Sequence, residues 1–212
     1  LEDRLAEVEA GIEVMELIKE LEYQVAKAKE RKDIVSAKDY RDEKEVAKKL
    51  EALTNEEVKE ALQERLDKVN KYLDDETAPK VNINDKDVFT EDVEIIVEDE
   101  NDVTITLTKD GEELEDTSKT SGDGIYTLTV IDKSFNETKV TFTVDGTKPV
   151  FNGLEDGKHY EEITIDVEDL TTTGIMISQD YQPEILIQNG TTIAIEGTFT
   201  LTATDEAGNS NT

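Results

Sequence analysis

The spacing of apolar residues changes once along the chain, near residue 75, and this change limits the folds that the sequence can adopt. Before that point, apolar residues recur every three or four positions, which is the period of an amphipathic helix. After it, they alternate with Thr and other polar residues, which is the period of a half-buried strand. The sequence therefore predicts a helical part followed by a β part.

The helical part contains three apolar stretches, so we expect a bundle of three helices in residues 1–75. Ser36 and Thr54 each precede an acidic residue by three positions, as in a capping box, in which the first side chain accepts a hydrogen bond from an unpaired backbone N–H. The second helix is expected to begin near Ala37 and the third near Asn55.

A weaker repeat links the two ends of this helical part. Residues 1–8 and 62–69 share Leu, Arg and Val at matching positions, at an offset of 61. We interpret the first helix as the continuation of a preceding helical repeat. The alternative is that any two amphipathic helices share such spacings.

The β part contains one unit twice. Residues 93–99 return at 163–169, at an offset of 70, and residues 124–136 return at 197–209, at an offset of 73. Short strands rich in Thr and β-branched residues, separated by Gly, Asn and Asp turns within about 70 residues, are typical of a small antiparallel sandwich. Two tandem β-sandwiches are therefore expected.

The repeats also set the expected domain boundaries. We expect a helical bundle in residues 1–75, a first sandwich in residues 76–145 and a second in residues 146–212. The strand of residues 138–144 has only residues 210–212 as its counterpart, so the last strand should be short and its edge open.

Three short motifs support the sandwich interpretation. Asp110-Gly111 and Asn189-Gly190 favour tight hairpin turns. Tyr126 lies in a segment that resembles a tyrosine corner, in which the hydroxyl bonds to backbone a few residues upstream. The alternative for Tyr126 is a plain core aromatic residue.

The β unit resembles a known family. Its pattern, from Thr-x-Pro through Gly-x-Tyr/Phe-Thr-Leu-Thr to Asp-x-x-x-Asn, resembles the bacterial immunoglobulin-like repeats of Gram-positive cell-surface proteins. The helical part is similar to three-helix repeats that accompany such modules in surface-layer and adhesin-like proteins. The resemblance implies a secreted, wall-attached, non-catalytic stalk. The first copy has Ser134-Phe135 where the second has Ala-Gly, so its turn is expected to differ in shape.

Composition excludes several classes of function. A formal charge of −30 repels nucleic acid, and the absence of Cys excludes disulfides and thiolate zinc sites. One His, 5% aromatic residues and no catalytic fingerprint argue against an enzyme. Membrane insertion is not expected, because no apolar run approaches the roughly 20 residues that a spanning helix needs.

The acidic residues are concentrated in the β part, where residues 76–212 hold 31 Asp and Glu, 8 Lys and no Arg. Our first interpretation is that these acidic side chains are solvated surface charges and caps of turns. The alternative is that some of them bind at least one structural calcium ion, because calcium bridges carboxylates. The candidate ligands lie where strands end, with Asn101, Asn136 and Asn209 beside them: Asp85, Asp87, Asp99, Glu100, Asp102, Asp132, Glu168, Asp169 and Asp205.

These features predict a structural spacer of a bacterial cell surface, connected to neighbouring domains of a parent chain and in contact with cell-wall polymer or with like protomers in a lattice. The first alternative is an adhesin that binds a host protein or glycan through the divergent segment 170–183, with Ile175, Met176 and Tyr181 as contacts. That segment can equally be an ordinary strand facing the core. A second alternative is an accessory region of a large secreted enzyme.

Overall fold

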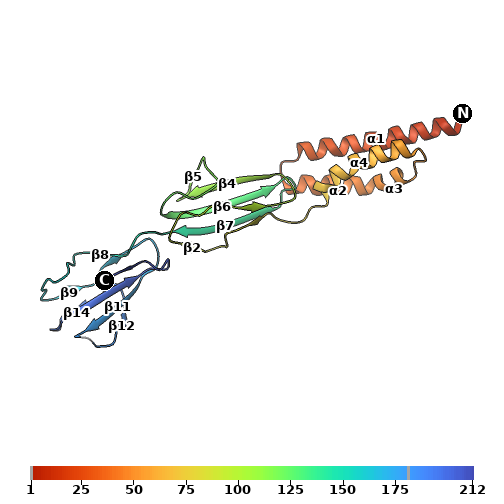
Figure 1. Cartoon of the computed structure of the whole chain (residues 1–212). Coiled ribbons are helices and arrows are strands. Elements are labelled where there is room, and N and C mark those ends of the chain that lie inside the picture. Colours follow the sequence, from red (N-terminus) through yellow and green to blue (C-terminus); the bar gives the residue numbers. More distant parts are fainter. Residues whose placement is uncertain (1, 181) are drawn as a thin grey trace. The chain divides into compact units, whose positions relative to one another are not determined.

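The computed structural model describes residues 2–180 and 182–212 and shows helices followed by strands (Figure 1). The helices in these residues are α1 (Glu2–Lys27), α2 (Arg31–Glu43), α3 (Val46–Glu51) and α4 (Glu56–Leu73). Their apolar stripes meet in one buried core that includes Ile18, Leu21, Ile34, Leu50 and Leu66. The predicted division into a helical part and a β part is confirmed.

The described residues contain four helices where three were expected. Helix α2 begins before Ser36, whose hydroxyl donates to the carbonyl of Lys32 at 2.9 Å inside the helix and caps nothing. Glu45 adopts a left-handed conformation, with φ of 52°, and this separates α2 from α3. The cap of α4 is Asn55 rather than Thr54, because the Asn55 side chain accepts from the N–H of Val58 at 3.1 Å.

The first copy of the β unit, called here the first β module, is built on a five-stranded sheet in the order β2-β7-β6-β4-β5. Strand β2 runs parallel to β7, and β1 pairs separately with β3. The strands are β1 (Lys80–Val81), β2 (Val88–Phe89), β3 (Val97–Glu98), β4 (Val103–Lys109), β5 (Glu112–Glu113), β6 (Gly124–Asp132) and β7 (Glu137–Val144).

The second copy, the second β module, has a four-stranded sheet in the order β12-β11-β14-β15 and two pairs, β8 with β10 and β9 with β13. Its strands are β8 (Val150–Phe151), β9 (Ile163–Thr164), β10 (Val167–Glu168), β11 (Gly174–Gln179), β12 (Ile185–Ile187), β13 (Thr192–Ile193), β14 (Phe199–Thr204) and β15 (Ser210–Asn211). In the described residues, no sheet mixes strands of the two modules. Strand β15 is short and lies at the edge of its sheet, as predicted.

The tyrosine corner predicted in the first β module is present. Tyr126 is fully buried, its hydroxyl donates to the carbonyl of Gly122 at 2.7 Å, and the same oxygen accepts from the N–H of Ser121 at 3.0 Å. Its ring stacks on Phe142 with a centroid separation of 5.5 Å. Tyr126 therefore serves both the core and the loop that precedes its strand.

One of the two predicted hairpins forms. Asp110 and Gly111 join the antiparallel strands β4 and β5 with φ angles of 51° and 89°. Asn189-Gly190 makes a turn but no hairpin, because β12 pairs with β11 while β13 pairs with β9. The dipeptide predicted the turn correctly and the strand pairing incorrectly.

Backbone proximity divides the chain into two compact units. One holds the helices up to Lys80 together with Val97–Ile105 and Thr129–Thr138, and the other holds the remaining segments up to Thr212. This division does not follow the boundaries expected from the repeats, which stay a prediction.

Candidate functional site

Six aspartates gather into two groups of three, in which carboxylate oxygens lie within 4.8 Å of one another. The first acidic cluster is Asp75, Asp99 and Asp132, and the second acidic cluster is Asp145, Asp169 and Asp205. Each cluster combines one aspartate from the segment that leads into a module (residues 75–79 and 145–149, called here the linkers), one that follows a short strand and one at or directly after the end of a longer strand. The two clusters thus occupy equivalent places in the repeat.

The turn after the longer strand is built in the same way in both modules. Asp132 accepts from the N–H of Ser134 at 2.7 Å and from the N–H of Asn136 at 2.9 Å. Asp205 accepts from the N–H of Asn209 at 2.8 Å. The predicted role of Asp132 and Asp205 as acceptors inside their own turns is confirmed.

The expected difference in shape between these turns is wrong. Phe135 has φ of 61° and Gly208 has φ of 95°, so both turns place a left-handed residue at the same position. Phe135 tolerates this conformation, which favours glycine, and its ring packs against the core of the helices. Contact with the helical core is the observed role of a bulky residue there.

The asparagine that closes each turn also holds the linker. The Asn136 side-chain amide donates to the carbonyl of Asp75 at 3.3 Å, and that of Asn209 donates to the carbonyl of Asp145 at 2.7 Å. Each amide donates as well to the aspartate that opens its own turn. One side chain therefore joins turn and linker in each module.

A second pair of hydrogen bonds holds each linker at its proline. The Thr138 hydroxyl donates to the carbonyl of Pro79 at 2.5 Å, and the Asn211 amide donates to the carbonyl of Pro149 at 2.9 Å. Both donors lie two residues beyond the turn asparagine. Each linker is thus attached at two points to the module that follows it.

None of these six carboxylates forms an ion pair within the described residues. Arg31 approaches the first cluster, but its guanidinium donates to the backbone carbonyls of Asp75 and Ser134, both at 2.9 Å. Burial raises the pKa of Asp132. The hydrogen bonds from Asn136 lower this pKa, whereas the negative charge of Asp75 raises it further. Burial is the main cause of a raised pKa at Asp169, and the negative charges of Asp145 and Asp205 raise this pKa further.

The structure brings together four of the predicted calcium ligands, namely Asp99 with Asp132 and Asp169 with Asp205. The remaining candidates lie outside both clusters. Asp85 accepts from the N–H of Thr141 and Asp87 from that of Asn84, and the side chains of Glu100, Asp102 and Glu168 are exposed.

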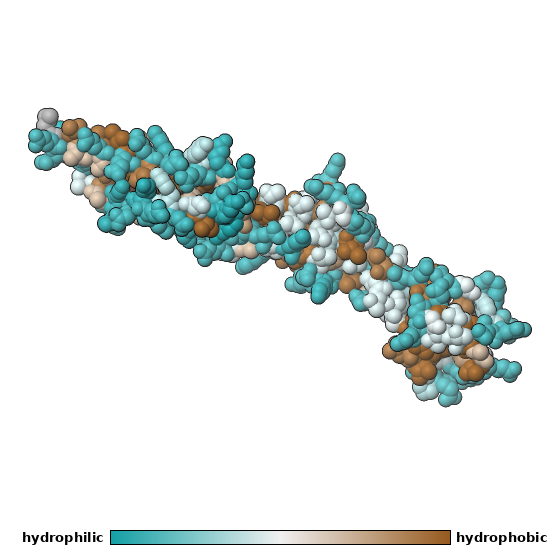
Figure 2. All heavy atoms as spheres, turned by 180° about the vertical axis from the view of Figure 1, so that it is seen from behind, coloured by the Kyte–Doolittle hydropathy of each residue, from teal (hydrophilic) through white to brown (hydrophobic). Residues whose placement is uncertain are grey.

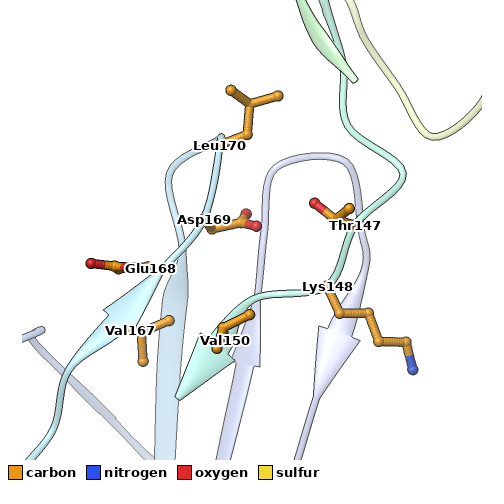
Figure 3. Close-up of a pocket in the computed structure, with 7 residues that line it drawn as sticks. All are labelled: Thr147, Lys148, Val150, Val167, Glu168, Asp169 and Leu170. Atoms are coloured by element: carbon orange, nitrogen blue, oxygen red, sulfur yellow. The ribbon is translucent and has the colours of Figure 1, made fainter. Parts of the chain in front are cut away.

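A shallow depression beside the second cluster shows the difference between neighbouring acids (Figure 3). The carboxylate of Asp169 is directed toward Thr147, whereas the side chains of Glu168 and Lys148 point away from it. The alternation of a strand places consecutive residues on opposite faces, so Asp169 and Glu168 cannot both reach the cluster.

Sequence reasoning missed Asp75 and Asp145, which were not among the candidate ligands. The signal for them is the pattern Asp-x-Thr-x-Pro, which occurs at residues 75–79 and again at 145–149. In both copies the aspartate side chain accepts from the N–H of the Thr two residues later, at 2.9 Å and 3.3 Å. The repeat thus fixes the linker carboxylate as well as the linker backbone.

The proposed ligand contacts in segment 170–183 need correction. Ile175 lies in strand β11, is 2% exposed and belongs to the core of the second β module, so it does not face a ligand. Met176 is half-buried in the same strand. Tyr181 lies outside the described residues. Ile175 and Met176 therefore belong to an ordinary strand of the sheet, which was the alternative interpretation of this segment.

Among the described residues, no helix has both the length and the apolar character needed to cross a membrane.

No protein-family model matches the chain, and no curated protein does. Similar solved structures include a three-domain titin immunoglobulin fragment in a Glu-to-Ala variant, at 9% identity and a TM-score of 0.32, over 63% of this chain and 62% of that chain. SGBP-B of the Bacteroides ovatus mixed-linkage glucan utilization locus, solved with a mixed-linkage heptasaccharide, matches at 16% identity and a TM-score of 0.26. This match covers 63% of this chain and 45% of that chain. The N-terminal two-domain immunoglobulin module of the Drosophila receptor tyrosine phosphatase DLAR matches at 13% identity and a TM-score of 0.24. This match covers 64% of this chain and 96% of that chain. The match spans less than two thirds of the titin fragment and less than half of SGBP-B.

Proposed function

We propose that this chain is a non-catalytic spacer region of a secreted bacterial cell-surface protein. The observation that carries the proposal is the repeated attachment of each linker to the module that follows it, through Asn136 with Thr138 and through Asn209 with Asn211. A spacer maintains a distance only if its joints resist bending. Hydrogen bonds that hold a linker reduce its conformational freedom.

The sequence resemblance to cell-surface repeats supports the location in this proposal, and the acidic composition agrees with an exposed region that stays soluble through its own charge. The partners of such a spacer are the neighbouring domains of its parent chain. Cell-wall polymer and like protomers in a lattice are the external partners that we propose.

The width of a distance distribution tests the proposal. Because the chain has no Cys, spin labels can be attached at Lys139→Cys in the first β module and Thr200→Cys in the second, both exposed positions. We expect a narrow distribution of label distances in the otherwise unchanged chain. We expect the double variant Asn209→Ala/Asn211→Ala to broaden it, because both attachments of the second linker are lost.

Asn152→Ala serves as the matched control, since the Asn152 amide bonds to Asp166 and to no linker carbonyl. This variant should leave the distribution unchanged. A broad distribution in the unmodified chain, or equal widths in all three proteins, would refute a spacer function based on fastened linkers.

An adhesin is the second candidate, favoured by apolar side chains exposed on the second β module. Ile185, Leu186 and Ile195 are 62%, 72% and 65% exposed, and Figure 2 shows apolar surface on this module. Binding of the whole chain to an array of host proteins and glycans, abolished by Leu186→Lys, would favour the adhesin. Absence of binding would favour the spacer.

A further inference from the structure

The first acidic cluster contains a buried amide oxygen without a hydrogen-bond partner. The Asn101 backbone N–H donates to Asp99 at 2.7 Å, and its side-chain amide nitrogen donates to Asp75 at 2.5 Å. Because the amide nitrogen and Oδ1 are bonded to the same carbon, Oδ1 lies close to the Asp75 carboxylate. Asn101 is 8% exposed, yet this oxygen has no hydrogen-bond partner among the described residues. Buried polar atoms are normally paired, so this one requires an explanation.

Ser134 adds a second atom of the same kind. Its backbone N–H donates to Asp132 and its side chain is fully buried. Its hydroxyl oxygen has no hydrogen-bond partner in the part of the chain that the structure describes. Two neutral oxygens, from Asn101 and Ser134, are thus unpaired on residues that bond to the carboxylates of the first cluster.

The charge of the first cluster is also unbalanced. Asp132 is 3% exposed, and Asp75 and Asp99 are half-buried, so water screens their mutual repulsion poorly. Arg31 uses its Nη1 for two carbonyl oxygens and forms no ion pair with the three aspartates. A bound cation would compensate this concentration of negative charge.

The second acidic cluster lacks the unpaired oxygen. Thr171 occupies the position equivalent to Asn101, and its hydroxyl donates to Asp145 at 2.8 Å. Ala207 occupies the position equivalent to Ser134. Asn101 and Thr171 both donate to the linker aspartate, and only Asn101 carries an additional unpaired oxygen, so the unpaired oxygens distinguish the first cluster from its copy.

We infer that the first acidic cluster binds one calcium ion through the carboxylates of Asp75, Asp99 and Asp132 and the amide oxygen of Asn101. Calcium takes six to eight oxygen ligands, carboxylates and amide carbonyls among them, in a flexible geometry. Water and backbone carbonyls complete such a set. Magnesium requires a more regular octahedron and keeps most of its own water, so a mixed set of protein oxygens favours calcium.

The ion would join three segments that are distant in sequence. Asp75 belongs to the linker after α4, Asp99 follows β3, and Asp132 ends β6. Bound calcium would therefore add to the hydrogen bonds of Asn136 and Thr138 that hold this linker. The inference does not depend on the spacer function, because it follows from the cluster alone.

Calorimetric titration of the full chain tests the inference, with calcium added to protein freed of metal by a chelator. We expect one calcium ion per chain and a rise in melting temperature with calcium that an equal concentration of magnesium does not give. Asp99→Asn should weaken calcium binding at least tenfold. Asp169→Asn, the same change in the second cluster, should leave that binding step unchanged.

The variant Asn101→Thr replaces Asn101 by threonine, the residue found at the equivalent position 171 of the second cluster, and keeps all three carboxylates. It therefore tests the calcium site even if Asp99→Asn fails to fold. We expect this variant to weaken calcium binding at least fivefold while its melting temperature in chelator stays close to that of the unmodified chain. Absence of calcium binding at 10 mM, an equal response to magnesium, or unchanged affinity in both first-cluster variants would overturn the inference.

Discussion

The two β modules share the construction of their joints and differ in their cores. In the first, Leu107, Tyr126, Leu128 and Phe142 are completely or almost completely buried, with Tyr126 and Phe142 stacked. In the second, the buried core consists of aliphatic side chains, and none of its described aromatic residues is buried. The repeated hydrogen bonds therefore belong to the linker and the turn, and a module can keep them while its core changes.

The acidic clusters show the same principle at one position. Asn101 and Thr171 both bond to the linker aspartate, so either residue serves the joint. Only Asn101 leaves an oxygen free. A single exchange within a repeated site can thus separate a structural role from a binding role.

The largest expected effect comes from Phe142→Ala in the first β module. Removal of a buried aromatic ring costs about 3–5 kcal/mol, and Phe142 also loses its contacts with Tyr126 and Phe89. We expect the first module to unfold at higher urea concentration than the second, and this variant to reverse that order. Hydrogen exchange measured peptide by peptide in urea reports each module separately.

Val150→Ala is the control for this comparison, because Val150 is 54% exposed and its loss should change stability by less than about 0.5 kcal/mol. An unmodified chain whose second module unfolds last would contradict the ranking of the two cores.

The change of apolar period and the internal repeat were sufficient to predict much of this architecture. Alternation of apolar residues predicted long strands such as β6, and the offset between copies predicted that β15 would be short. The tyrosine corner followed from its local sequence, since the Tyr126 hydroxyl needs only a carbonyl a few residues upstream.

The failures have a common physical origin in long-range contacts. Ser36 has the spacing of a cap, but the helix continues through it, and the left-handed Glu45 ends a helix that was expected to run on from Ala37. Asp75 and Asp145 look like linker residues until the fold places the strand-end aspartates beside them. Local spacing predicts a turn or a helix, whereas a cluster depends on segments that only the tertiary fold brings together.

Tyr126→Phe should have the second largest effect. The substitution keeps the ring and leaves the carbonyl of Gly122 and the N–H of Ser121 without their partner, so we expect a loss of about 1–3 kcal/mol. The second module has Phe199 at this place, so the variant makes the two modules alike. Urea denaturation of the first module measures the loss, and a change below about 0.5 kcal/mol would show that the hydroxyl contributes nothing beyond the ring.

Gly208→Ala tests the turn of the second β module. With φ of 95°, Gly208 adopts a conformation that costs an L-residue about 1–2 kcal/mol, and an added Cβ meets no atom within 4 Å. We therefore expect a loss of that size from backbone strain alone, measured by thermal unfolding. Ala207→Gly, at the neighbouring position, should leave this strain unchanged, and equal effects of both substitutions would contradict the assignment to φ.

The smallest expected effect is a dependence of the second module on pH. Asp169 has a pKa raised above its ordinary value of 3.8, by burial and then by the charges of Asp145 and Asp205. The folded state therefore keeps a proton that the unfolded state has already lost, so stability is highest below pH 3.8 and falls as pH rises through the raised pKa. The effect is small because Asp169 is partly exposed and salt screens its neighbours.

Asp169→Asn removes this titration, so in chelator its second module should lose less stability than the unmodified chain between pH 3 and pH 7. Glu168→Gln is the control, because Glu168 is exposed and points away from the cluster.

The first cluster should respond differently. Calcium should abolish the corresponding pH dependence there, since the ion compensates the charges of Asp75, Asp99 and Asp132, while the second module keeps its own. If calcium changed both modules equally, the distinction between Asn101 and Thr171 would have no consequence for binding.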